Sequence, residues 1–182
     1  MNFKTALLAT AIAATGLLAT SANAATDGTI TITGTVVPQT CQVDGNAYGT
    51  SDVKAVTLPS VMATKLNTAG AIAGKTGFSI AVTNCPSLLT SVQTYFSGGK
   101  INSSNGNLDN SGTATNVQVQ LLNASGAVMD LSKSTATAQN SPSVSLSGGA
   151  ATLNYSAQYY ANGGAAGAGS VTSTVDFTMI YQ

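Results

Sequence analysis

The chain has 182 residues, of which only 7% are charged, and its six Lys balance its six Asp to a net charge of zero. A protein that displaces phosphate counterions needs a basic surface, so this composition excludes a nucleic-acid partner. The sequence contains no His, Glu or Arg, the usual general acids, bases and anion clamps. We therefore expect no enzyme, and no catalytic, cofactor-binding or metal-binding residue is predicted.

The first 24 residues have the layout of a secretory signal peptide. Lys4 provides the positive start, and Leu7–Leu18 is an apolar run shorter than the roughly 20 residues that span a bilayer. Ala22-Asn23-Ala24 offers the small residues of a cleavage site. We expect residues 1–24 to be removed, so that the mature chain is exported and begins at Ala25.

Cys41 and Cys85 are the only two cysteines, and both lie in the exported part. An even pair in an oxidising compartment is typical of one disulfide, which would stabilise the fold by about 4 kcal/mol in the chain-entropy model. The alternative is a catalytic dithiol or a metal pair. It is disfavoured because the two residues lack CxxC spacing and the chain lacks histidine.

Segments that alternate apolar and polar residues follow one another along the mature chain, and none keeps a helical period beyond about two turns. Polar stretches at Ser97–Asn116 and Ser132–Ser143 are predicted to be exposed loops, and Leu58–Leu66 is compatible with a single helical turn. Short strands between such loops predict an all-β sandwich of immunoglobulin-like size in one domain. The predicted strands are Thr29–Val37 with a continuation to Val43, Phe78–Val82, Val92–Phe96, Val117–Leu121 with a hairpin partner at Val128–Leu131, Leu153–Tyr159, and Val171–Tyr181.

The last predicted strand, Val171–Tyr181, runs to the end of the sequence without a hairpin partner after it. A patterned strand without a neighbour leaves an open sheet edge, and an open edge invites a strand from another chain. Thr29–Val37 is a candidate for that incoming strand. On the residues alone, an ordinary first strand that pairs within its own sandwich is an equally good interpretation of Thr29–Val37.

In combination, these segments resemble the type 1-type pilus subunits of bacteria, which are assembled by the chaperone-usher route. The resemblance covers nearly the whole mature chain, and its motifs are specific together although each alone is weak. The matching segments are Gly28–Val37 followed by Cys41, Val56–Val61, Phe78–Ile80 leading to Asn84-Cys85, Val117–Leu121, and Ala168–Val171 continuing through Phe177–Gln182.

The resemblance implies an incomplete immunoglobulin-like β-sandwich that lacks its seventh strand. In this family, a periplasmic chaperone lends the missing strand, and at the outer-membrane usher the N-terminal extension of another subunit replaces it. The resemblance places that extension at residues 25–38, the pilin domain at 39–182, and the family's disulfide at Cys41–Cys85. The implied donor residues are Thr29, Ile30, Ile32, Gly34 and Val36; the implied acceptor groove and chaperone contact comprise Val171, Val175, Phe177, Met179, Tyr181 and the terminal carboxylate of Gln182.

These features predict a structural subunit that polymerises by donor-strand complementation into a surface fimbrium for cell adhesion or biofilm formation. Its predicted partners are other copies of itself, related pilus subunits, the chaperone and the usher. A minor adaptor or a tip adhesin for a host carbohydrate is one alternative, although tip adhesins of this family carry an extra domain for which this chain has no room. A self-complemented, monomeric secreted β-sandwich is the other.

Overall fold

The structure, a computed structural model, describes residues 31, 33–34, 41–47 and 53–182. The chain divides into two units, Met1–Thr35 and Val36–Gln182. In the first unit Thr31, Thr33 and Gly34 are described, and all three are exposed. The predicted signal peptide lies outside the described residues, and so do Thr29, Ile30, Ile32 and Val36 of the predicted donor strand.

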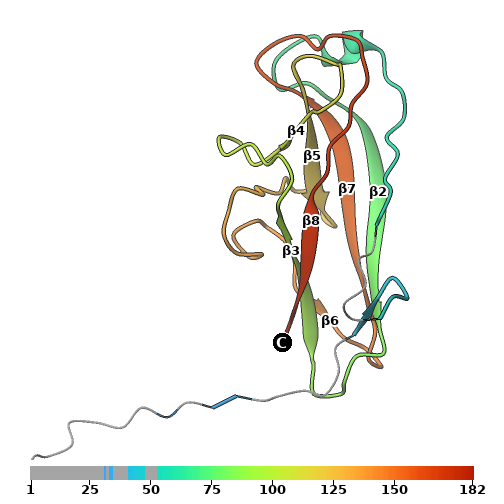
Figure 1. Cartoon of the computed structure of the whole chain (residues 1–182), viewed down its shortest axis with the longest axis vertical. Helices are drawn as coiled ribbons and strands as arrows, with labels where there is room; N and C mark the ends of the chain where they lie inside the picture. Colours follow the sequence, from blue (N-terminus) through green and yellow to red (C-terminus); the bar gives the residue numbers. More distant parts are fainter. Residues whose placement is uncertain (1–30, 32, 35–40, 48–52) are drawn as a thin grey trace, which may run out of the picture. The chain divides into compact units, whose positions relative to one another are not determined.

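The second unit is a sandwich of two antiparallel sheets (Figure 1). The larger sheet has the order β1-β2-β7-β5-β4, and the smaller sheet has the order β6-β3-β8. β8 is therefore an edge strand among the described residues. The strands are β1 (Gln42–Val43), β2 (Ile72–Thr83), β3 (Ser91–Ser97), β4 (Leu108–Asp109), β5 (Val117–Asn123), β6 (Val144–Ser145), β7 (Ala151–Ala161) and β8 (Asp176–Tyr181), with one 3-10 turn, η1 (Ala63–Leu66).

The core lies between the two sheets because the alternating apolar residues of each strand turn toward the opposite sheet. Ile80 of β2 and Leu153 of β7 are buried in one cluster with Phe96 of β3. Tyr155 of β7 meets the ring of Phe96 edge-on, with 5.2 Å between ring centroids. Its phenol oxygen lies 3.0 Å from the hydroxyl of Ser141, so the polar end of this buried ring is satisfied.

Most of the predicted elements are confirmed, with changes at their ends. β2 begins six residues before the predicted Phe78, and η1 supplies the predicted helical turn. The expected partner at Val128–Leu131 is reduced to an isolated bridge between Leu122 and Val128. β8 is shorter than predicted, because the regular ladder begins at Asp176. No helix in the described ranges is long and apolar enough to cross a bilayer.

The predicted exposed loop at Ser132–Ser143 is wrong for Ala136, Gln139 and Ser141, which are buried. β6 pairs with β3 only at Ser91 and Val92. Beyond β6, the Gln139 side chain forms the hydrogen bonds that a neighbouring strand would form with β3. Its Oε1 accepts the N–H of Phe96 at 3.0 Å, and its Nε2 donates to the carbonyl of Phe96 at 2.6 Å. A polar segment is thus drawn into the core by hydrogen bonding to backbone groups.

The predicted loop at Ser97–Asn116 is likewise wrong for Asn107 and Leu108, which are buried, and it contains β4. Asn107 donates from its amide to Gln118 of β5 at 3.1 Å. Gln118 in turn donates to the carboxylate of Asp109 at 2.7 Å. This network of side chains fastens the loop to the outer face of the larger sheet.

The predicted disulfide is confirmed, since Cys41 and Cys85 are bonded across a sequence separation of 44. Cys41 lies directly before β1 and Cys85 lies shortly after β2. The bond therefore ties together the two strands that pair at this edge of the larger sheet. Cys41 is also a member of the buried core.

Candidate functional site: an apolar groove beside an open strand edge

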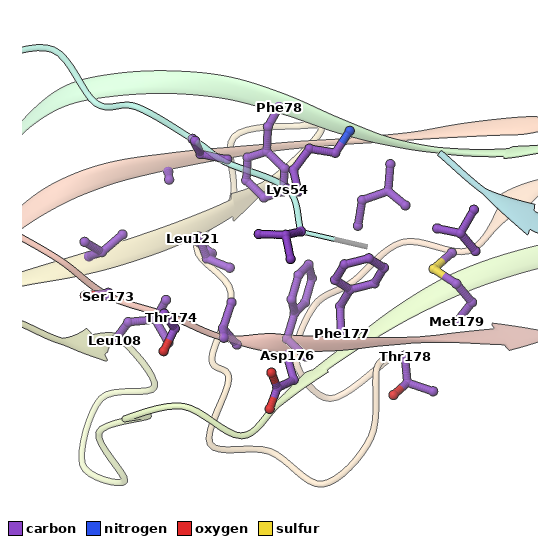
Figure 2. A pocket seen from close by; sticks show the side chains of 18 of the residues that line it. Lys54, Phe78, Leu108, Leu121, Ser173, Thr174, Asp176, Phe177, Thr178 and Met179 are labelled. Carbon is purple, nitrogen blue, oxygen red and sulfur yellow. The ribbon is translucent and has the colours of Figure 1, made fainter. Parts of the chain in front are cut away.

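An apolar groove of about 1030 Å³ runs along β8 and the extended segment before it (Figure 2). Its other wall is formed by residues 53–58, and its floor includes residues of β2, β5 and β7. The structure brings five of the predicted acceptor residues together in its lining: Val171, Val175, Phe177, Met179 and Tyr181.

The side chains of β8 alternate between the groove and the surface. Figure 2 shows Phe177 and Met179 pointing into the groove, whereas Asp176 and Thr178 point away from it. Phe177 and Met179 are only half-buried. The inward-facing Phe96 on the neighbouring strand β3 is 2% exposed. Phe177 and Met179, the groove row of β8, therefore contact the core on one side, and no strand among the described residues covers them on the other.

The opposite wall was not assigned to the site from the sequence. Val56 and Leu58 are half-buried against the core, and Val53 is 87% exposed although it is apolar. In the sequence, Val56 and Leu58 alternate with Thr57, a pattern that indicates an extended segment with one apolar face. No ladder forms on residues 53–61, however, so this wall is extended without being a regular strand. An exposed apolar surface of this kind marks a binding site in a stable protein.

One ion pair borders the groove. Lys54 lines it, and its Nζ lies 2.8 Å from Oδ2 of Asp44. The other carboxylate oxygen of Asp44 accepts the backbone N–H of Ala81 at 2.9 Å. Because the charges of Lys54 and Asp44 offset each other, this part of the wall suits an uncharged segment.

The hydrogen-bonding direction of β8 follows from its pairing with β3. Gln182 and Ser91 exchange both backbone hydrogen bonds, at 3.0 and 3.1 Å. Bonded and non-bonded pairs alternate in an antiparallel ladder, so Ile180, Thr178 and Asp176 also direct their N–H and C=O groups toward β3. Consequently, the odd-numbered residues of β8 direct theirs toward the opposite edge.

No described strand lies on that opposite edge of β8. It carries the N–H and C=O groups of Phe177, Met179 and Tyr181, the same residues whose side chains line the groove. The position of Phe96 supports this assignment independently. Its partner on β8 is Phe177, yet its own N–H and C=O groups bond Gln139 on the far side of β3.

The end of β8 is anchored by Gln182, the residue that follows the strand. A terminal oxygen of Gln182 accepts the N–H groups of Thr90 and Ser91 at 2.6 and 3.1 Å, and the Thr90 hydroxyl at 3.2 Å. Burial raises the pKa of the neighbouring Tyr181 phenol above its ordinary value of 10.0, so this groove residue stays neutral. Gln182 itself is exposed and lies outside the groove lining.

A second pocket, of about 320 Å³, lies at the Val171 end of the groove. Val171 and Tyr159 line both hollows and therefore stand between them. The Tyr159 ring packs over Gly74, where an added Cβ would lie 2.9 Å from the ring. Gly74 also has a φ of +67°, which favours glycine, so this close approach requires the residue that the chain has.

These features suit the binding of an extended peptide rather than a reaction. Within the described part of the chain, no group of three or more His, Cys, Asp or Glu side chains is placed to hold a metal ion. An apolar groove beside an unpaired strand edge offers both requirements of strand addition. The edge provides main-chain hydrogen bonds, and the groove provides pockets for alternate side chains.

Comparisons with known proteins agree with this architecture. A family model described as "Fimbrial protein" matches residues 30–182. The F17 fimbrial protein of Escherichia coli is 40% identical over 177 residues, which cover 92% of this chain and 96% of that protein. The major fimbrial subunit SMF-1 of Stenotrophomonas maltophilia (strain K279a) is 43% identical over 169 residues, which cover 89% and 96% of the two chains.

Solved structures show the same fold. The P pilus rod subunit PapA superposes with a TM-score of 0.60 at 18% identity, over 78% of this chain and 99% of its own. A subunit in the structure of a chaperone-usher pilus superposes with a TM-score of 0.59 at 21% identity, over 85% and 95% of the two chains. The fold is therefore the immunoglobulin-like β-sandwich of pilus subunits. The chain belongs to the fimbrial protein family, and it is a structural subunit of a surface fimbrium rather than an enzyme.

Proposed function

We propose that the subunits join by donor-strand complementation, in which residues 25–38 of one copy fill the groove of the next. The observation that carries this proposal is the row of half-buried apolar side chains, among them Phe177 and Met179, beside the unpaired edge of β8. In the donor, Ile30, Ile32 and Val36 alternate with polar residues and would enter the groove. Gly34 would lie on the same face between Ile32 and Val36, where the resembling family keeps a small residue.

The composition of the donor segment agrees with the groove that it would enter. Asp27 is the only charged side chain in residues 25–38, and the groove is largely apolar. Each backbone hydrogen bond contributes about 1 kcal/mol net, and each buried Ile or Val contributes roughly 1.5 to 3 kcal/mol. Several of each give on the order of 10 kcal/mol before the cost of ordering the strand. Such a contact dissociates slowly, as a fibre requires.

The open groove also implies a need for protection before assembly. An unpaired edge with exposed apolar side chains is an aggregation hazard in a free subunit. We propose that residues 1–24 direct the chain to the periplasm, where a chaperone covers the groove and contacts Tyr181 and the carboxylate of Gln182. An outer-membrane usher would then exchange the chaperone for the next donor. The finished fibre would serve adhesion or biofilm formation.

Matched substitutions in the donor segment test the proposal. The mature chain is produced with its chaperone and usher as wild type, Ile32→Asp and Thr33→Asp, and fibres are counted by electron microscopy. Ile32→Asp is expected to abolish fibres, because it places a charge in the apolar groove. Thr33→Asp alternates to the other face and is expected to leave them. Equal fibre yields from the two variants would contradict the assignment.

Two further measurements separate assembly from its alternatives. Tyr181→Ala is expected to weaken capture by the chaperone, measured by co-purification. Removal of residues 25–38 is expected to stop polymerisation while leaving a subunit that binds a synthetic peptide of the same residues. If the intact chain instead stays monomeric at high concentration with chaperone and usher present, its own N-terminal strand fills the groove.

A further inference from the structure

The wall of the groove extends past the start of β8 to residues 171–175. The strand that pairs with β8, β3, does not extend that far. β3 ends at Ser97, which pairs with Asp176, so residues 170–175 have no partner in the smaller sheet. A loop between β4 and β5 stands there instead. Figure 1 shows the segment that precedes β8 passing the end of the sandwich where β4 ends and β5 begins.

Two side chains of this loop replace the carbonyls of a missing strand. Oδ1 of Asn110 accepts the backbone N–H of Thr172 at 2.8 Å, and Oγ1 of Thr113 accepts the N–H of Ser170 at 2.9 Å. The loop backbone completes both pairs. The N–H of Ser111 donates to the carbonyl of Thr172 at 2.8 Å, and the N–H of Ala114 donates to that of Ser170 at 3.0 Å.

Asn110 also holds the loop in its own shape. Its Oδ1 accepts the N–H of Gly112 at 2.8 Å, and its Nδ2 donates to the carbonyl of Ala114 at 2.8 Å. The loop approaches the wall so closely at Gly112 that an added Cβ would collide with the carbonyl oxygen of Ser170. A side chain at this position would therefore push the loop and the wall apart.

The residue numbers in these hydrogen bonds show which way the backbone of residues 170–175 points. Ser170 and Thr172 have the same parity as the β8 residues that bond β3, so the backbone keeps one hydrogen-bonding direction from residue 170 to Gln182. The backbone groups of the odd-numbered residues therefore face the open edge along the whole length, and all of these residues line the groove. They are Val171, Ser173, Val175, Phe177, Met179 and Tyr181. The groove lining also includes the even-numbered Thr172, Thr174, Asp176 and Thr178.

We propose that Asn110 and Thr113 are positioning residues that extend the strand-accepting edge beyond β8 as far as Val171. They hold the even-numbered N–H groups, so that the odd-numbered backbone groups of residues 171–175 are presented to an incoming strand. The edge then spans about 33 Å instead of the length of β8 alone. This inference rests on the proposed function, because the edge matters only where a strand is accepted.

Amide hydrogen exchange tests the inference with the wild-type peptide of residues 25–38 and the mature subunit carrying Ile32→Asp, which stops the chain from donating its own strand. This subunit, whose groove is unaltered, serves as the wild type below. In the free wild type, the amides of Ser170 and Thr172 are expected to be protected, and those of Val171 and Ser173 to exchange fast. Peptide binding is expected to slow exchange at Val171 and Ser173 as well as along the odd-numbered residues of β8.

The variants Asn110→Ala and Thr113→Val are expected to lose peptide protection at residues 171–175 and to keep it along β8. Peptide dissociation should become about tenfold faster or more, since at least two main-chain hydrogen bonds are lost. Thr113→Ser keeps the hydroxyl that accepts the N–H of Ser170. Thr113→Ser is therefore expected to retain the wild-type protection pattern. Asn110→Asp keeps an Oδ1 acceptor but replaces the Nδ2 donor to the Ala114 carbonyl with a charged oxygen, so it does not serve as a control.

Three results would overturn the inference or separate it from the proposed function. Unchanged protection at residues 171–175 in both Asn110→Ala and Thr113→Val would overturn it. Equal loss of protection along the whole edge would also overturn it, because that pattern indicates a general structural role. Failure of the peptide to bind the wild type would refute the proposed function instead. If Asn110→Ala does not fold, the comparison of Thr113→Val with Thr113→Ser still tests the inference.

Discussion

Gln139 is expected to be one of the most sensitive polar positions in this subunit. Its side chain is 0% exposed and makes four hydrogen bonds. It accepts from the N–H of Phe96 and donates to the carbonyls of Phe96, Leu131 and Lys133, at distances from 2.6 to 3.1 Å. Gln139→Met keeps a similar volume but removes all four bonds. The change leaves backbone groups at the edge of β3 without partners.

The size of the effect follows from the groups that lose their partner. A buried donor or acceptor left unsatisfied costs about 1 to 3 kcal/mol, and the N–H and C=O of Phe96 are two such groups. With a smaller contribution from the two other carbonyls, the free energy of unfolding is expected to fall by about 4 kcal/mol. At a urea m-value of about 2 kcal/mol/M, the unfolding midpoint falls by about 2 M.

Urea unfolding of the mature subunit carrying Ile32→Asp, saturated with the wild-type peptide of residues 25–38, measures this loss. Gln139→Glu is an informative companion, because it keeps an acceptor for Phe96 but places a carboxylate against three carbonyls. Burial raises the pKa of that carboxyl in the folded state above its unfolded value of about 4.3. The variant should therefore be most stable below that pH and lose stability as the pH rises. A midpoint of Gln139→Met within about 0.3 M of the wild type would refute the reasoning.

Three other predictions concern the disulfide and two titrating groups. Reduction of Cys41–Cys85, which closes a loop of separation 44, should lower the free energy of unfolding by about 4 kcal/mol, and an unchanged urea midpoint under reducing conditions would contradict this. A hydrogen bond from the Ser132 hydroxyl lowers the pKa of the Asp130 carboxyl below its ordinary value of 3.8. The stability that this hydrogen bond contributes is therefore present above pH 3.8 and is lost as the pH falls through the lowered pKa. Ser132→Ala should therefore weaken the subunit at about pH 6 and have little effect at about pH 2 in acid unfolding curves. Burial raises the pKa of Tyr181 above 10.0, so the stability that its neutral form contributes holds below that value and is lost as the pH rises through the raised pKa. Tyr181→Phe should therefore remove a late phenol from an absorbance titration, and an unchanged late phase would contradict the assignment.

Local pattern predicted much of the sandwich. Alternation of apolar and polar residues located β3, β5 and β7, since side chains in a strand alternate between its two faces whatever lies beyond them. Two cysteines in an exported chain allowed a single pairing. The final strand, predicted to have no hairpin partner, pairs with β3 on one side and lies at the edge of the smaller sheet among the described residues. Its alternation predicted that Phe177 and Met179 line the groove. The donor residues Ile30, Ile32 and Val36 lie outside the described part of the chain and stay predictions.

The sequence by itself thus determined the fold class, the disulfide and the side of the last strand that faces the core. Only the tertiary structure decided how the edges of the smaller sheet are completed. Gln139 bonds Phe96 across 43 positions, and Asn110 bonds Thr172 across 62. Both lie in polar segments predicted to be exposed. A polar side chain carries no periodic signal for the distant backbone group that it will satisfy, because that partner is chosen by where the folded chain brings the two together.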